Sequence, residues 1–269
     1  MLTSQRKLLL LEMLNREGKI VATGAAQALA VSEDTIRRDL RELAREGRLQ
    51  RVHGGALPAS PAMGDFAARQ QIAPDDKSAI GRAAAAMVQP GQVVFIDGGT
   101  TSAQLVRQLP PGLQATVVTH SPSIALELVS HPTIEVIMLG GRLFRHSVVN
   151  VGATTVDAIR QFRADLYFMG VCSVHPEAGL STGDFEEAGV KRALSAAAAE
   201  TIVLASPEKL MTASPYQVIP LSELSALVTV ASVPEETLSP YRQRGITVHL
   251  ASRIPSHRTP ATDEYHQMI

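Results

Sequence analysis

From residue 75 to residue 251, short apolar runs rich in β-branched residues alternate with segments whose apolar residues have helical spacing. Such alternation is typical of an α/β domain with a largely parallel sheet. The sequence predicts strands at residues 93–96, 116–118, 134–139, 166–169, 201–204, 227–230 and 246–249. It predicts helices between them at residues 76–88, 101–109, 123–130, 154–161 and 185–199.

The turn after the first predicted strand, F-I-D-G-G-T-T, is the main candidate for binding a ligand. Ligands of open parallel sheets bind beyond the carboxyl ends of the strands. Glycines let main-chain N–H groups approach an anion, and a helix N-terminus favours negative charge, so phosphate is the expected ligand. An ordinary glycine turn capped by threonine is the alternative, and spacing alone does not separate the two. The candidate residues of this turn are Asp97, Gly98, Gly99, Thr100 and Thr101.

Four later turns also follow predicted strands or precede predicted helices. Glu187 and Lys191 lie four residues apart on one helix, which suits a surface ion pair; alternatively, Lys191 reaches a phosphate or a sugar hydroxyl. Arg142 is more simply explained as a surface charge than as a ligand contact. The candidate effector-binding residues of these turns are Thr119, His120, Ser121, Gly140, Gly141, Glu187, Lys191 and Lys209.

A different pattern occupies the amino-terminal 57 residues. Ser32 is a good helix N-cap, and Ile36, Leu40 and Leu43 then follow at helical spacing and define one buried stripe. The opposite face carries arginines, and a short helix at residues 23–30 precedes the cap by a few residues. This spacing is typical of a helix-turn-helix, whose second helix enters the major groove of DNA. A solvated arginine face on an ordinary surface helix is the alternative.

The arginines of this second helix suit two kinds of DNA contact. Near the helix start, arginine can bond guanine bidentately, whereas arginines further along are better placed for phosphates. Arg6 and Lys7 on the first helix, predicted at residues 4–17, fit a DNA-backbone contact and a solvated face equally well. His53 is expected to shape the turn after the strand at 49–52. The candidate DNA-binding residues are Ser32, Asp34, Thr35, Arg37, Arg38, Arg41, Arg45, Arg51 and His53.

Two segments carry a resemblance to a known family. The sequence T-I-R-R-D-L at 35–40, followed by R-V-H-G-G-A at 51–56, resembles the DeoR family of bacterial transcription regulators. The resemblance implies a winged helix-turn-helix whose recognition helix begins near Ser32.

Residues 77–229 resemble the effector-binding domain of the same family. That resemblance implies a fold similar to ribose-5-phosphate isomerase and the CoA transferases, with a phosphate loop at residues 97–101. Two positions depart from the family pattern: His120 stands where asparagine is usual, and Ser206 stands where aspartate is usual, so that only Lys209 carries over from that motif.

The charge distribution agrees with a small DNA-binding domain on a larger acidic one. Residues 1–57 hold ten Lys/Arg and seven Asp/Glu, whereas residues 58–269 hold fifteen and nineteen. At 269 residues the chain is too long for a winged helix alone. We expect a DNA-binding domain at 1–57, a Pro- and Ala-containing linker at 58–74, an α/β effector domain at 75–251 and a disordered tail at 252–269.

Several classes of protein are disfavoured. The single cysteine, Cys172, excludes an internal disulfide framework and offers no metal cluster, and no cofactor is expected. Cys172 itself is expected to be a small buried residue. No apolar run approaches the roughly 18 residues of a membrane span, so we expect a cytoplasmic protein with no membrane partner.

Two functions then compete. The first is a DNA-binding regulator, most simply a repressor, that a phosphorylated sugar or similar metabolite releases from its operator. The second is an isomerase-like enzyme using Asp97, Asp184, Glu187 and Lys191 as acids and bases. The helix-turn-helix favours the regulator, because an isomerase does not need one. We expect double-stranded DNA, the metabolite and a second copy of the chain, as dimer or tetramer, to be its partners.

Overall fold

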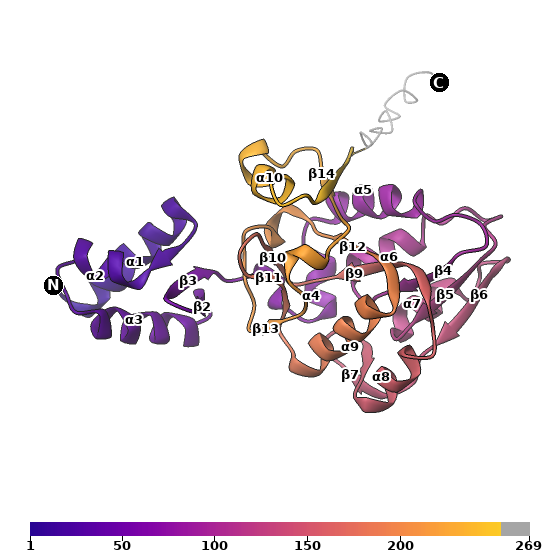
Figure 1. The fold of residues 1–269 in the computed structure, drawn as a ribbon, viewed down its shortest axis with the longest axis horizontal. Helices are drawn as coiled ribbons and strands as arrows, with labels where there is room; N and C mark the ends of the chain where they lie inside the picture. The colour runs from indigo at the N-terminus through magenta and orange to yellow at the C-terminus, as the bar shows by residue number, and fades with distance from the viewer. Residues whose placement is uncertain (254–269) are drawn as a thin grey trace, which may run out of the picture.

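The computed structural model describes residues 1–253, which form a small amino-terminal domain and a larger domain joined by a short segment (Figure 1). The small domain has three helices, and its three short strands form an antiparallel sheet in the order β1-β3-β2. This is the predicted winged helix-turn-helix. Its elements are α1 (Thr3–Glu17), β1 (Ile20–Val21), α2 (Ala22–Ala28), α3 (Glu33–Arg45), β2 (Leu49–Val52) and β3 (Gly55–Pro58).

The residues that the sequence assigned to the core of the small domain lie there. Ile36, Leu40 and Leu43 of α3 are buried together with Leu10 of α1. The Ser32 hydroxyl accepts a hydrogen bond from the Thr35 amide at 3.3 Å and so caps α3 as expected.

Arg6 plays neither of the two roles considered for it. It is 5% exposed and forms a bidentate pair with Asp39 of α3, which is fully buried. This pair joins α1 to α3 inside the domain and removes Arg6 from the surface. Lys7 pairs with Glu42 and Glu46 at 2.9 Å each.

The larger domain is built on a parallel sheet of seven strands in the order β15-β14-β12-β9-β4-β5-β6. All seven predicted strands belong to it. Strands β4 and β9 lie at its centre, with β5 and β6 beyond β4 and with β12, β14 and β15 beyond β9. The strands are β4 (Val93–Ile96), β5 (Ala115–Thr119), β6 (Ile134–Met138), β9 (Ala164–Gly170), β12 (Ala198–Leu204), β14 (Ala226–Val230) and β15 (Thr247–Ala251).

Helices pack along this sheet and complete its core. Helix α5 lies against β14 and β15, α7 against β5 and β6, and α9 against β9 and β12. Phe95, Tyr167 and Phe168 fill the centre of the core and are fully buried. The helices are α5 (Pro74–Ala85), α6 (Thr100–Val106), α7 (Pro122–Leu128), α8 (Ala153–Ile159), α9 (Phe185–Ala196) and α10 (Glu235–Arg242).

The sequence did not predict α10 or the small antiparallel elements. These strands have two to four residues, which is too short for a periodic pattern to identify them. They form a hairpin and a three-stranded sheet in the order β10-β11-β13. The strands are β7 (Arg142–Phe144), β8 (Val149–Val151), β10 (Ser173–His175), β11 (Gly179–Thr182) and β13 (Tyr216–Gln217).

Residues 59–73, which we call the connecting segment, join the two domains but do not form an extended linker. The segment contains η1 (Pro61–Met63) and α4 (Phe66–Gln70), which Asp65 caps by accepting from the Ala68 amide at 2.8 Å. It is also bound to the larger domain, since the Phe66 amide donates to the His146 carbonyl at 3.0 Å. The Pro and Ala content predicted a linker. The contacts that hold this segment could not be predicted from it, because they are made with residues far along the chain.

Two further expectations concern the carboxyl-terminal tail and membrane-spanning helices. The tail predicted to be disordered falls at residues 254–269 outside the described residues. Within residues 1–253, no helix is long and apolar enough to cross a membrane.

Candidate functional site

The arginines of α3 form an exposed face on the small domain. Arg38, Arg41 and Arg45 are exposed, and among the described residues none of them has a hydrogen-bonded or ion-paired partner. Arg37 differs, because its guanidinium is held by Glu33 at 2.6 Å. A shallow surface hollow is lined by Asp34, Thr35, Arg37, Arg38 and Arg41.

The remaining DNA candidates lie around this face. The hydroxyls of Ser32 and Thr35 lie 2.9 Å apart, so both are engaged at the start of α3. Arg51 on β2 and His53 in the turn to β3 are exposed. The structure therefore leaves Arg38, Arg41 and Arg45 of α3 and Arg51 of the wing free to reach a partner outside the chain.

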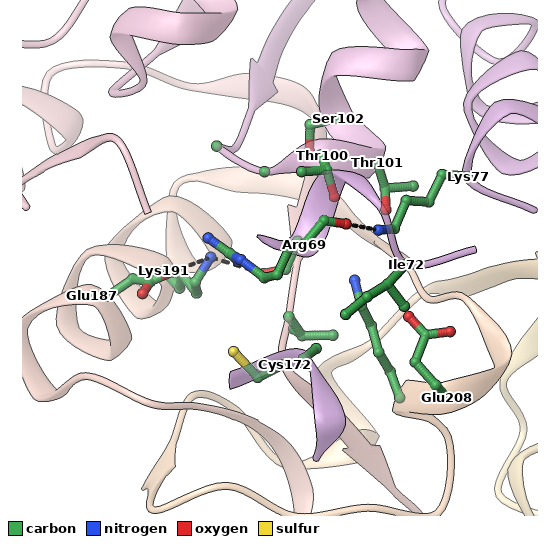
Figure 2. A pocket seen from close by; sticks show the side chains of 16 residues that line it. Arg69, Ile72, Lys77, Thr100, Thr101, Ser102, Cys172, Glu187, Lys191 and Glu208 are labelled. Carbon is green, nitrogen blue, oxygen red and sulfur yellow. Dashed lines mark hydrogen bonds and ion pairs between the residues drawn. The ribbon is translucent and has the colours of Figure 1, made fainter. Parts of the chain in front are cut away.

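A second site lies in the larger domain, where strands β4, β9 and β12 end. Figure 2 shows a narrow cavity, here called the anion cavity, between the loop at residues 97–102, α9 and the connecting segment. Its free volume of about 20 Å³ holds about one water molecule. The lining residues are Ala62, Arg69, Ile72, Lys77, Gly98, Gly99, Thr100, Thr101, Ser102, Gly170, Val171, Cys172, Glu187, Lys191, Glu208 and Lys209.

Asp97 anchors the floor of the anion cavity. It is fully buried and accepts hydrogen bonds from the Gly98 amide at 2.7 Å, the Tyr167 hydroxyl at 3.1 Å and the Gly170 amide at 3.1 Å. Lys191 also donates to it. Burial alone would raise the pKa of Asp97, but the charge of Lys191 and the hydrogen bond from His120 outweigh it and hold that pKa below its usual range.

His120 lies behind Asp97 and makes no contact with the cavity. It is fully buried; its Nδ1 is 2.8 Å from the Asn150 carbonyl oxygen and its Nε2 is 2.8 Å from Asp97 Oδ1. Both ring nitrogens therefore face oxygen atoms of the protein, and neither is left for a ligand. The position at which this chain departs from the family's asparagine therefore supports the carboxylate.

Lys191 and Glu187 form a buried pair, not the surface pair considered from the sequence. Lys191 is 1% exposed, and its Nζ lies 3.2 Å from Glu187 Oε1 and 2.8 Å from the Gly170 carbonyl oxygen. Burial would lower the pKa of Lys191, but Asp97 and Glu187 raise it above its ordinary value, so this lysine carries a charge.

Two further lysines face the anion cavity without a comparable carboxylate. Burial, with the nearby charge of Lys209, lowers the pKa of Lys77 to about 8, and its Nζ donates to the Arg69 carbonyl (Figure 2). Burial also lowers the pKa of Lys209, although Glu208 opposes that shift. Both ammonium groups are thus short of negative charge, and a bound anion would supply it.

The loop at residues 97–102 supplies hydroxyl groups to the same cavity. Thr101 is 3% exposed and Ser102 is fully buried, and neither hydroxyl has a hydrogen-bond partner among the described residues. In Figure 2 the hydroxyl oxygens of Thr100 and Thr101 point toward the space beside Lys77. Gly98 must lack a side chain, because a Cβ there would lie 2.2 Å from Val149 Cγ1.

Some predicted residues do not reach the cavity wall. Thr119 and Ser121 are buried behind it, with Thr119 donating to the Ile96 carbonyl at 2.6 Å. Gly140 and Gly141 are exposed and do not line this cavity. Gly141 is needed for packing instead, since a Cβ there would lie 2.0 Å from Thr155 Oγ1.

Sequence reasoning also missed residues that do line the cavity. Arg69 and Ile72 come from the connecting segment, about 30 residues before the loop they face. Nothing local marks them, because only the tertiary fold brings the segment over the strand ends. Cys172 is buried as expected, but it also lines the cavity.

Comparisons with known proteins cover both domains. Residues 6–61 match the family described as "DeoR-like helix-turn-helix domain", and residues 72–230 match "DeoR C terminal sensor domain". The HTH-type transcriptional regulator GlpR of Haloferax volcanii is 31% identical over 250 residues, covering 92% of this chain and 98% of that protein. The HTH-type transcriptional repressor GlcR of Bacillus subtilis is 29% identical, covering 85% and 89%.

Another relative and one solved structure extend the comparison. The glycerol-3-phosphate regulon repressor of Escherichia coli is 31% identical over 192 residues, which is 71% of this chain and 76% of that protein. Ribose 5-phosphate isomerase A of Methanocaldococcus jannaschii is 18% identical with a TM-score of 0.37, covering 49% of this chain and 52% of that chain.

Proposed function

Since this chain belongs to the DeoR family of transcriptional regulators, we propose that it is a repressor released from its operator by a phosphorylated sugar or a related metabolite. The observation that carries the effector half of this proposal is the anion cavity. Buried lysines with lowered pKa values and unpartnered hydroxyls there face one small volume.

The DNA half of the proposal rests on the exposed arginines of α3. In a helix-turn-helix, the amino-terminal residues of the second helix reach base edges. Arg38 and Arg41 lie closest to that end among the free arginines and would contact bases, whereas Arg45 and Arg51 would contact phosphates. Arg37 would position the helix, because Glu33 already holds its guanidinium.

The effector half rests on charge and hydrogen-bonding capacity. A phosphate in the anion cavity would accept from the Thr101 and Ser102 hydroxyls and from Lys77 and Lys209. Each charge-assisted hydrogen bond contributes about 1.5–3 kcal/mol, and the dianion would favour the charged form of both lysines. Lys191 would add charge from the floor without leaving Asp97.

The connecting segment offers a route from effector to DNA. The anion cavity holds about one water molecule as it stands, so a phosphorylated metabolite must displace neighbours to enter. Arg69 and Ile72 are the neighbours that come from the segment. The Arg69 carbonyl also accepts a hydrogen bond from Lys77 Nζ. An effector that uses Lys77 competes with this bond and so acts on the segment.

The other end of the connecting segment continues the wing. The Pro58 carbonyl of β3 accepts from the Ala213 amide at 3.0 Å, and the Ser60 hydroxyl donates to the Cys172 carbonyl. Movement of the segment would therefore change how the wing is held against the larger domain. The effector would then bind better to the state that grips DNA less well, and that difference in affinity sets the size of the response.

A dimer or tetramer is part of the proposal. One three-helix domain covers a short stretch of DNA, and proteins of this kind read two half-sites through a two-fold symmetric pair.

The test uses the full-length protein and the DNA upstream of its own gene. Fluorescence anisotropy should show binding to that DNA above random DNA, and a panel of phosphorylated metabolites should include one that releases it. The same mixtures are assayed for product. Release without turnover supports the regulator, and turnover supports the isomerase-like alternative. If the protein does not prefer the upstream DNA to random DNA, the proposal that this DNA contains its operator is refuted.

A further inference from the structure

A second cavity adjoins the anion cavity and shares Arg69, Cys172 and Glu187 with it. Its free volume is about 240 Å³. This is about twelve times the free volume of the anion cavity, so it has the room for an organic group that the anion cavity lacks. Its other lining residues are Phe144, His146, Ser147, Gly183 and Asp184.

The sign of the charge changes from one cavity to the next. In the anion cavity Arg69 and three lysines outnumber the carboxylates of Glu187 and Glu208. In the second cavity the carboxylates of Asp184 and Glu187 outnumber Arg69, its one permanent cation among the lining residues. Glu187 lies at the junction. Its Oε1 is 3.2 Å from Lys191 Nζ, and its Oε2 accepts from the Ser147 hydroxyl at 3.3 Å.

This lining selects one kind of chemistry. Ionised carboxylates are acceptors only, so they bind hydroxyl groups and repel further anions. Phe144 is half-buried and offers an apolar face, which suits the C–H groups of a carbohydrate. Arg69 donates to the Ser147 hydroxyl at 3.3 Å and holds it at the wall between the two cavities.

We propose that the second cavity binds the hydroxyl-bearing carbon chain of the effector, and that the effector is therefore a monophosphate of a polyhydroxylated compound with no second anionic group. This inference rests on the proposed function, because the phosphate must occupy the anion cavity for the chain to reach Asp184. The basic and acidic ends of the joined cavities fix the direction in which the effector lies.

Asp184 allows a clean substitution. Its Oδ1 caps α9 by accepting from the Glu187 amide at 2.9 Å, and asparagine caps helices as well as aspartate does. Asp184→Asn therefore keeps the cap and removes the charge. Glu186→Gln is the matched control, because Glu186 is exposed on the same helix, pairs with Arg142 and lines neither cavity.

The experiment is titration calorimetry on the full-length protein. The probes are inorganic phosphate, monophosphates of sugars and polyols with three to six carbons, fructose 1,6-bisphosphate and 6-phosphogluconate. The best monophosphate should bind at least about tenfold more tightly than inorganic phosphate. It should exceed fructose 1,6-bisphosphate and 6-phosphogluconate, which have an anionic group at each end, by the same factor. A tenfold difference in Kd corresponds to one good hydrogen bond gained or one charge repelled. Asp184→Asn should lose that advantage and leave inorganic phosphate affinity unchanged.

The outcomes separate this inference from the proposed function. Equal affinity for inorganic phosphate and every monophosphate overturns the inference and leaves the anion site standing. So does an Asp184→Asn protein whose selectivity matches that of Glu186→Gln. Failure of every probe, inorganic phosphate included, refutes the proposed effector site itself and the inference with it.

Discussion

Replacing Thr101 by valine should separate folding from effector binding. Valine has nearly the shape of threonine, so the substitution removes a hydroxyl group without opening a cavity. That hydroxyl is buried and has no hydrogen-bond partner among residues 1–253. Leaving such a group unsatisfied costs about 1–3 kcal/mol, so its removal should stabilise the free protein by about 1 kcal/mol.

The same substitution should weaken effector binding. A hydrogen bond from the Thr101 hydroxyl to a phosphate is worth about 1.5–3 kcal/mol, which corresponds to a Kd raised about 10- to 100-fold. The melting temperature should rise by about 2–4 °C. Calorimetric titration with the releasing metabolite and thermal melts of the free protein measure the two effects, and affinity for operator DNA should not change.

Thr229→Val is the matched control. The Thr229 hydroxyl is also buried and unpartnered among the described residues, but it lies on β14 and does not line the anion cavity. Its removal should raise the melting temperature similarly and leave effector affinity unchanged. If Thr101→Val binds effector like the unmodified protein, or melts several degrees lower, the Thr101 hydroxyl is not a phosphate ligand and the reasoning fails.

Three further predictions concern the arginines, the lysines and the connecting segment. Arg38→Ala should weaken operator binding by about 1–3 kcal/mol with little effect on random DNA, measured by anisotropy beside Arg16→Ala; equal losses on both DNAs would make Arg38 a phosphate contact. Effector affinity should fall as the pH rises above about 8. Lys77 has Lys209, Glu208 and Arg69 as its charged neighbours, and bound phosphate raises its pKa, so the complex keeps a proton that the free protein loses. Constant affinity from pH 7 to 9.5 would contradict this. Hydrogen exchange should rise in residues 59–73 on effector binding and not in α10, and an unchanged segment would exclude it as the route to DNA.

Local sequence patterns were sufficient for the recognition helix, for the strands of the large sheet and for the loop of the anion cavity. The recognition helix follows from a Ser32 cap and a stripe of Ile36, Leu40 and Leu43, because capping and amphipathic spacing act within a few residues. The seven strands follow from their apolar β-branched runs. The loop at residues 97–102 was found because a parallel sheet binds ligands where its strands end.

For other residues, burial or long-range contact decided between the alternatives that the sequence left open. Glu187 and Lys191 have the spacing of a surface pair, yet the sheet buries them beside Asp97. His120 follows a strand as a ligand contact would, yet both its nitrogens are used by Asp97 and Asn150.

The sequence by itself determined a DNA-binding fold, a parallel sheet and a glycine-threonine loop, since each depends on interactions between residues close in the chain. Only the tertiary structure decided that Arg69 and Ile72 of the connecting segment close the anion cavity, and that Asp184 and Ser147 form an acidic compartment beside it. These placements depend on contacts between segments distant in sequence, whose free energy comes from packing that no local pattern records.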